Sequence, residues 1–280
     1  MTPAVLADLV HSAVVRVLGD RGLATTAVPD EVDLVRPRDP GRGDYATTVA
    51  LRAAGAAGVA PVELAGWLAD ALVTDVRLAA VEVAGPGFVN LRLTAATRAE
   101  SVRATTGVRS TVNSTPPATV HGQAVSELAE LVGVDAARYA AFRESAVDIE
   151  ILGRRTDDNP VHCVQYAHSR LDSLLRNAEA LGIELSTVDL ELLDHPREVE
   201  LARTVAEFPA IVDAAPHRLT RYLESLADQA RGLTEHRRVL PLGDEEPGRE
   251  HSGRLALCAA ARHVLATGLG RLGITAPQRL

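Results

Sequence analysis

Three side chains of the stretch N-P-V-H-C-V-Q-Y-A-H-S-R, residues 159–170, are suited to contacting nucleic acid. A tyrosine ring such as Tyr166 can stack on a base, and the guanidinium of Arg170 can pair with a phosphate or a base edge. His162 offers a second ring for stacking. Asn159 followed by Pro160 is typical of a helix start. The stretch therefore predicts an aromatic and cationic patch on one helix.

A helical wheel divides residues 161–178 into an apolar and a polar face. The apolar face carries Val161, Val164, Leu171, Leu175 and Ala178, and the polar face carries His162, Tyr166, Ser169, Arg170 and Ser173. A tyrosine at the centre of a polar face is unusual. Either RNA or a second packed helix would account for it, and the pattern alone leaves both interpretations open. A basic surface around Arg170 and Arg176 would favour RNA, whereas an acidic or covered surface would favour a protein partner.

The first hundred residues predict a small mixed α/β domain. Apolar spacing and proline positions predict helices over 4–18, 61–73 and 95–104, and composition favours a helix over 45–54. Strands are predicted over 32–35, 76–83 and 88–93, the last two joined by the turn A-G-P-G.

The rest of the chain predicts a linker followed by a helical bundle. Residues 105–119 are polar, contain prolines and show no periodicity, as in a linker. Pro160, Pro196 and Pro216 each stand where a helix begins, and two long apolar stripes follow. The predicted fold class is α+β, with a mixed domain over 1–104, a linker over 105–121 and an all-α domain over 122–280.

Composition restricts the ways in which this chain can bind RNA. All 29 basic residues are arginine, and the net charge is −8. A protein that coats nucleic acid is basic overall, so RNA binding here requires a local patch.

No apolar run approaches the roughly 18 residues of a membrane span, and the first residues carry no basic segment typical of a secretion signal. We expect a cytoplasmic protein with no membrane partner, whose two distant cysteines are thiols.

Several long motifs resemble one enzyme family. In the second half they are the stretch 159–170 and the segments L-L-D-H-P-R-E-V-E-L-A-R-T-V-A-E-F-P (192–209), P-H-R-L-T-R-Y-L-E (216–224) and 255–280. In the first half they are G-D-Y-A-T-T-V-A-L (43–51) and A-G-P-G-F-V-N-L-R-L (84–93). Together these collinear motifs resemble the N-terminal domain and the DALR anticodon-binding domain of arginyl-tRNA synthetases.

The family's catalytic domain has no counterpart in the sequence. In the family, a nucleotide-binding domain with H-I-G-H-like and K-M-S-K-like signatures lies between the two resembling parts. Here no His-x-x-His occurs, and a chain without lysine has no K-M-S-K signature. We therefore expect the linker to stand in place of the catalytic domain, and we expect no arginine activation or tRNA charging by this chain alone.

The resemblance implies roles for particular residues. Tyr166 and Arg170 match anticodon-loop contacts of the family, while the family's aromatic pair at 162–163 is here His162 and Cys163, so one stacking tyrosine is replaced. Phe88 and Asn90 match a strand that touches the D-loop at the tRNA elbow. A buried Phe88 with a structural Asn90 is the alternative.

Other motifs point to no catalytic, cofactor or metal site. The segment G-P-G (85–87) lacks the third glycine of a dinucleotide site. His162 and His168 fall on different helix faces, so they are not a metal pair. No nucleophile, base and orienting group can be assembled into one set.

Three functions follow from these observations. The first is a non-catalytic tRNA-binding protein that contacts the elbow and the anticodon stem-loop, preferably of arginine isoacceptors. The second is a protein-interaction module that partners a synthetase or a translation factor. The third is a split component that complements a catalytic domain made elsewhere.

Overall fold

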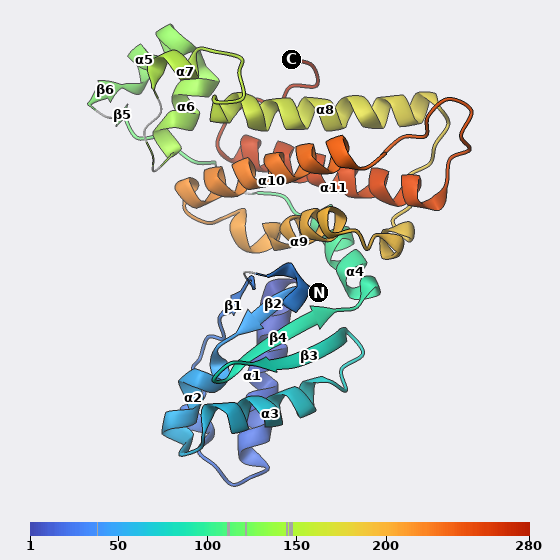
Figure 1. Ribbon diagram of the computed structural model, residues 1–280. Helices are drawn as coiled ribbons and strands as arrows, with labels where there is room; N and C mark the ends of the chain where they lie inside the picture. The colour runs from blue at the N-terminus through green and yellow to red at the C-terminus, as the bar shows by residue number, and fades with distance from the viewer. Residues whose placement is uncertain (38, 111–112, 121, 144, 146–147) are drawn as a thin grey trace. The chain divides into compact units, whose positions relative to one another are not determined.

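The computed structural model describes residues 1–280 except 38, 111–112, 121, 144 and 146–147. The chain forms two compact units, Met1–Ser101 and Val102–Leu280, with the division inside helix α4 (Ala95–Thr105). The first unit is mixed α/β, and the second is almost entirely helical (Figure 1). The predicted α+β fold class is confirmed.

A four-stranded antiparallel sheet organises the N-terminal unit, with strand order β1-β2-β4-β3. Alternate residues of its long central strand, Val89, Leu91 and Leu93, are buried in the core together with helices α1, α2 and α3. This alternation is the expected signature of a strand with one apolar face. The elements are α1 (Pro3–Gly19), η1 (Thr25–Ala27), β1 (Leu34–Val35), η2 (Pro40–Arg42), β2 (Tyr45–Thr47), α2 (Val49–Ala57), α3 (Pro61–Leu72), β3 (Leu78–Ala84) and β4 (Phe88–Leu93).

The predicted helix over residues 45–54 is wrong in its first part. Tyr45–Thr47 is strand β2, and helix α2 begins only at Val49. The preceding Asp44 fixes this strand because its buried carboxylate accepts a hydrogen bond from the Leu93 amide at 2.7 Å. Pairing with a neighbouring strand thus overrides the local helical preference of an alanine-rich segment.

Two glycines allow the backbone to approach strand β4 and its turn closely. Gly43 has a φ of 121°, and a Cβ there would lie 2.8 Å from the Leu91 carbonyl oxygen. Gly87 has a φ of 139°, and a Cβ there would lie 3.0 Å from atoms of Pro61. Both positions therefore require glycine.

The second unit is a helical bundle with one small hairpin. Helix α8 packs against α10 and α11, and α9 packs against the same two helices (Figure 1). The prolines at 160, 196 and 216 begin α8, α9 and α10, as predicted. The elements are β5 (Thr119–Val120), β6 (Gln123–Ala124), α5 (Val125–Val132), α6 (Val134–Phe142), α7 (Ile149–Leu152), α8 (Pro160–Ala180), η3 (Asp189–Leu192), α9 (Pro196–Ile211), α10 (Pro216–His236) and α11 (Arg249–Arg271).

A buried carboxylate, that of Glu198, connects three helices of this bundle. One oxygen accepts hydrogen bonds from Arg254 of α11 at 2.6 Å and from Arg237, directly after α10, at 3.3 Å. The other oxygen caps α9 by accepting from the His195 amide at 3.2 Å. The side chains of Glu198 and Arg254 are only 2% and 6% exposed. The charge is therefore paired where water does not reach it.

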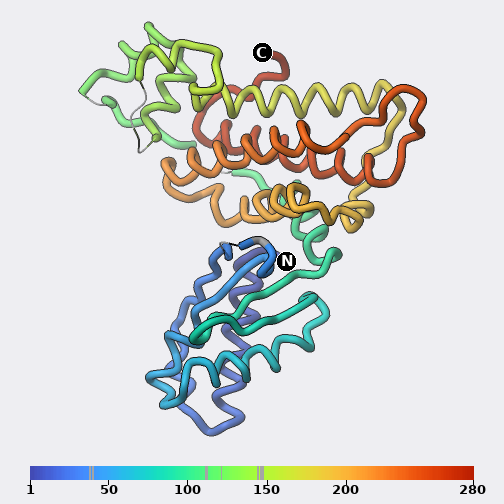
Figure 2. Tube along the Cα trace, in the orientation of Figure 1, coloured from blue at the N-terminus to red at the C-terminus, as the bar shows by residue number. Residues whose placement is uncertain are grey.

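Residues 275–278 run along helix α8 and are held there by its polar side chains (Figure 2). The Gln165 amide donates to the Thr275 carbonyl at 3.0 Å, and Ser169 donates to the Gln278 carbonyl at 3.2 Å. The buried ring of His168 lies 2.9 Å from the Pro277 carbonyl oxygen. Burial lowers the pKa of His168 below its ordinary value of 6.5.

No single helix in the described parts of the chain is both long and apolar enough to cross a bilayer. Helices α2 and α3 pass the test only as a pair, and they are bent by 119° relative to each other.

The substitution Glu198→Ala is expected to destabilise the helical unit by about 3–5 kcal/mol, because it leaves the buried Arg254 with only the exposed Glu250 as counter-charge and removes the carboxylate that pairs with the partly buried Arg237. Urea denaturation followed by circular dichroism measures this. Trp67, the only tryptophan, reports on the N-terminal unit by fluorescence and should show little change. Glu179→Gln removes an exposed carboxylate and serves as the control; equal stability of the two variants would contradict the prediction.

The pKa of His168 predicts a pH dependence of stability. The pKa of His168 is lower in the folded protein, so below a pH of about 6.5 the unfolded chain binds more protons than the folded one. The free energy of unfolding therefore decreases as the pH falls below about 6.5, and this histidine does not change it at higher pH. His168→Gln should lose this dependence, whereas the exposed His217→Gln should keep it. Urea denaturation of each protein at a pH above and a pH below this value measures the difference. The same acid destabilisation in all three proteins would contradict the assignment.

Candidate nucleic-acid interface

The start of helix α8 is locked to the segment before it by Asn159. Its side-chain oxygen accepts from the His162 amide at 3.5 Å and caps the helix. Its side-chain nitrogen donates to the carbonyls of Leu152 and Arg154 at 3.0 and 2.7 Å. The first turns of α8 are thereby held in a fixed orientation, which fixes the direction of the side chains that follow.

Tyr166 and His162 lie one helical turn apart on α8 and form a pair of rings. Their centroids are 6.0 Å apart and the planes are tilted by 31°. Tyr166 is 42% exposed, an unusual amount for an aromatic side chain in this bundle. Arg170 is exposed one turn further on, where its Nε lies 3.4 Å from the Thr234 hydroxyl. The structure thus places His162, Tyr166 and Arg170 along one side of α8.

The polar face of α8 is partly covered, which the wheel did not predict. Ser169 was placed on the solvent-facing side, yet it is buried beneath residues 277–278. Its hydroxyl, the Gln165 amide and the His168 ring each contact a backbone carbonyl of residues 275–278. Of the predicted polar face, the surface around Tyr166 and Arg170 is the exposed part.

A hollow of about 440 Å³ lies beside His162, and we call it the His162 hollow. Besides His162 it is lined by Gln165, Arg154, Arg155 and Leu280, among others. Arg154 pairs with Glu150 at 3.0 Å, whereas Arg155 has no ion-pair partner within the described residues. Asp135 also lines the hollow, and the Gln165 amide already donates to it at 2.9 Å. The ring of His162, the guanidinium of Arg155 and the apolar Leu280 are the groups in the hollow that suit a base and its phosphate.

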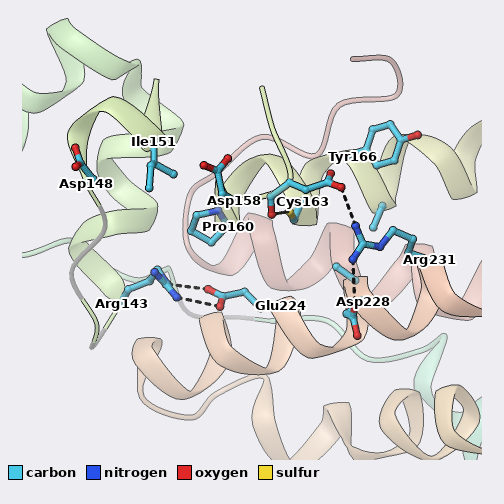
Figure 3. A pocket seen from close by; sticks show the side chains of 13 residues that line it. Arg143, Asp148, Ile151, Asp158, Pro160, Cys163, Tyr166, Glu224, Asp228 and Arg231 are labelled. Carbon is cyan, nitrogen blue, oxygen red and sulfur yellow. Dashed lines mark hydrogen bonds and ion pairs between the residues drawn. The ribbon is translucent and has the colours of Figure 1, made fainter. Parts of the chain in front are cut away.

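A second hollow of about 480 Å³ opens on the other side of the start of α8, and we call it the acidic groove (Figure 3). Tyr166 stands at its rim and Cys163 lines it. Its carboxylates are Asp148, Asp157, Asp158, Glu224 and Asp228, against the two guanidiniums of Arg143 and Arg231. This surface repels phosphate.

The charge around α8 is therefore divided and does not form one basic patch. Arg176 is paired with Asp172 at 2.9 Å, and Arg262 binds the same carboxylate at 2.8 Å. Arg170 has no ion-pair partner within the described residues. The cations that would favour RNA lie apart, with Arg170 beside Thr234 of α10 and Arg155 in the His162 hollow. The acidic groove has the character that favours a protein partner.

In the N-terminal unit, Phe88 and Asn90 differ in exposure. Phe88 is 38% exposed at the start of strand β4, whereas Asn90 is 6% exposed between Ala46 and Glu82 on the neighbouring strands. Arg92, two residues further, donates to the Gly41 carbonyl at 2.5 Å. Phe88 is therefore available to a ligand as it stands, and Asn90 offers little surface.

The two cysteines have raised pKa values. Burial raises the pKa of the Cys163 thiol, and burial raises that of Cys258 to about 12. Both are thiols without a disulfide. Among the residues that the structure describes, no three His, Cys, Asp or Glu side chains are grouped as metal ligands.

Sequence reasoning missed the acidic groove and the cation Arg155. The dipeptide D-D at 157–158, next to the Asn159 cap, was a visible signal for the groove. Its remaining acids are the N-cap residue of α7 and two residues of α10, so that only the tertiary packing brings them together. Arg155 gains its place in the His162 hollow in the same way.

Two family profiles match the chain. The arginyl tRNA synthetase N terminal domain matches residues 5–93, and the DALR anticodon binding domain matches residues 164–280. Between them, the described residues form α4, the β5–β6 hairpin, α5 to α7 and the start of α8. The family's catalytic domain is absent from these 280 residues.

The relatives are arginyl-tRNA synthetases. An arginine–tRNA ligase of Frankia alni is 51% identical over 166 residues, which cover 55% of this chain and 30% of the relative. The Thermus thermophilus arginyl-tRNA synthetase structure is 27% identical with a TM-score of 0.43, over 65% of this chain and 31% of the other. The Plasmodium falciparum enzyme is 21% identical with a TM-score of 0.44, over 55% of this chain and 28% of the other. The chain spans about a third of the length of these relatives. It comprises an arginyl-tRNA synthetase N-terminal domain followed by a DALR anticodon-binding domain.

Proposed function

We propose that this chain is a non-catalytic protein that binds tRNA, with arginine isoacceptors preferred. The observation that carries the proposal is the presence of both tRNA-binding domains of arginyl-tRNA synthetase in one chain without the catalytic domain. Binding would take place in the cytoplasm, where translation uses tRNA. Domains retained without their catalytic partner are suited to holding RNA and have no means of activating an amino acid.

The proposed anticodon contact uses the start of helix α8. His162 and Tyr166 offer ring faces to unstacked bases, and Arg170 and Arg155 offer guanidiniums that no described carboxylate neutralises. Single-stranded loops are recognised by such combinations of stacking and cationic groups. The replacement of the family's aromatic pair by His162 and Cys163 weakens one stacking position, so we expect a broader choice of anticodon than in the synthetases.

The proposed elbow contact uses strand β4 of the N-terminal unit. Phe88 is the exposed ring there, and Asn90 is its buried neighbour on the same strand face. We assign stacking on the D-loop to Phe88. Asn90 supports the strand and reaches RNA only if its surroundings open.

A second candidate function is a protein-interaction module that partners a synthetase or a translation factor. The acidic groove favours it, because five carboxylates beside Tyr166 oppose RNA on that side of α8. A third candidate, a split component of arginyl-tRNA synthetase activity, requires a catalytic domain on another chain.

The substitution Tyr166→Ala is expected to weaken binding of arginine tRNA by about tenfold or more, since base stacking contributes roughly 1–3 kcal/mol. Arg170→Gln should weaken binding less than Tyr166→Ala does. It should also reduce the slope of log Kd against the logarithm of the salt concentration by about 1. A filter-binding titration with arginine tRNA and a mismatched tRNA, at two salt concentrations, measures both effects.

The matched control for this titration is Arg218→Gln at the start of helix α10. Arg218 is exposed, and helical rise places it roughly 24 Å along α10 from Thr234, the neighbour of Arg170. Unchanged affinity in Tyr166→Ala, or an equal loss in Arg218→Gln, would contradict the assigned surface. No binding of either tRNA at low salt would overturn tRNA binding itself.

The chain alone is expected to show no arginine-dependent exchange of pyrophosphate into ATP and no charging of tRNA, because the ATP-binding domain is absent from it. Both reactions are measured with radiolabelled substrates, using an intact arginyl-tRNA synthetase as the positive control. Exchange by the purified chain would contradict the proposal, and exchange only on adding a second chain would support the split component.

A further inference from the structure

We propose that the acidic groove is a docking site for a basic segment of a partner protein, one that carries several arginine or lysine side chains. The groove lies between helix α7, the start of α8 and helix α10 within one unit (Figure 3). This inference gives the second candidate function a partner chemistry, and it stands whether or not tRNA binds.

The charge of the groove is only partly neutralised by its own arginines. Arg143 is occupied by Glu224, with contacts of 2.8 and 3.1 Å. Arg231 donates to Asp228 at 3.1 Å (Figure 3). It also donates to Asp157 at 3.2 Å.

Two further carboxylates make no ion pair with a described residue. Asp148 and Asp158 have no ion-pair partner within the described residues, and they come from separate segments that both border the groove. Five carboxylates against two guanidiniums leave an excess of three negative charges. A ligand that supplies several cations at once would complement them.

The walls of the groove also contain apolar surface between the charges. Ile151, Pro160, Ala167 and Ala227 line it, and the exposed ring of Tyr166 stands at its rim. The methylene stems of arginine and lysine pack on such surface while their charged ends reach carboxylates, and a tyrosine ring stacks on a guanidinium. The carboxylates are not grouped as a metal site in the described structure.

A protein segment fits these features better than RNA does. Phosphate groups would meet the unneutralised Asp148 and Asp158, which repel them. A peptide chain brings cationic and apolar side chains together in one ligand, as the mixed walls require, and 480 Å³ accommodates more than one side chain.

The test uses the full chain and a short fluorescein-labelled peptide that alternates arginine with leucine and alanine. Anisotropy titration at low salt should show binding, and replacing every arginine by the uncharged citrulline should abolish it. Asp157→Asn/Asp158→Asn should weaken binding about fivefold to tenfold, because it removes two of the five carboxylates and each exposed charge pair contributes little. Both side chains are exposed, so the variant should fold, which circular dichroism checks.

The control Glu179→Gln/Glu184→Gln removes the same charge from exposed positions near the far end of α8 and should bind as the wild type does. The alkylation rate of Cys163, which lines the groove, shows whether the peptide binds in the groove. The other cysteine, Cys258, is fully buried and does not contribute to this rate. Peptide binding should slow alkylation of Cys163, and spermine at equal charge should not.

Four results would overturn the proposal: no peptide binding at low salt, equal weakening in the control variant, equal slowing of Cys163 alkylation by spermine, or protection of Cys163 by tRNA and not by the peptide. Loss of tRNA binding alone would leave it intact, because the peptide assay contains no RNA.

Discussion

The buried carboxylate of Glu198 is the interaction on which the helical unit most depends. It caps α9 and pairs with Arg254 of α11 and with Arg237, directly after α10. A charge so far from water is tolerated only when its partners are held in place, and here those partners belong to the helices against which α8 packs. Helix α8 and its exposed side chains rest on the two helices that this carboxylate joins to α9.

Helix α8 separates two surfaces of opposite chemical character. On one side the His162 hollow contains the ring of His162 and the guanidinium of Arg155, which can donate hydrogen bonds to an anion or a base. On the other side the acidic groove carries an excess of negative charge. Tyr166 stands between them, since its ring pairs with His162 while its side chain lines the groove. The same short segment can therefore serve RNA on one side and a basic protein on the other.

Much of this organisation was readable from the sequence, for identifiable reasons. Proline at the first position of α8, α9 and α10, together with the Asn159 cap, gave local signals that do not depend on tertiary structure. The strand over Tyr45–Thr47 was missed, because its pairing with β4 is non-local. The burial of Ser169 was missed because residues more than a hundred positions later cover it. The acidic groove needed side chains from three separate segments, which no periodicity reveals.

Nuclease footprinting of end-labelled arginine tRNA, with and without the chain, tests the central claim most directly. Non-catalytic binding by both domains predicts that the anticodon loop and the D-loop at the elbow are both protected. Tyr166→Ala should lose protection of the anticodon loop, and Phe88→Ala should lose protection of the D-loop. An unchanged cleavage pattern at saturating protein, or protection that is uniform along the tRNA and insensitive to both substitutions, would contradict it.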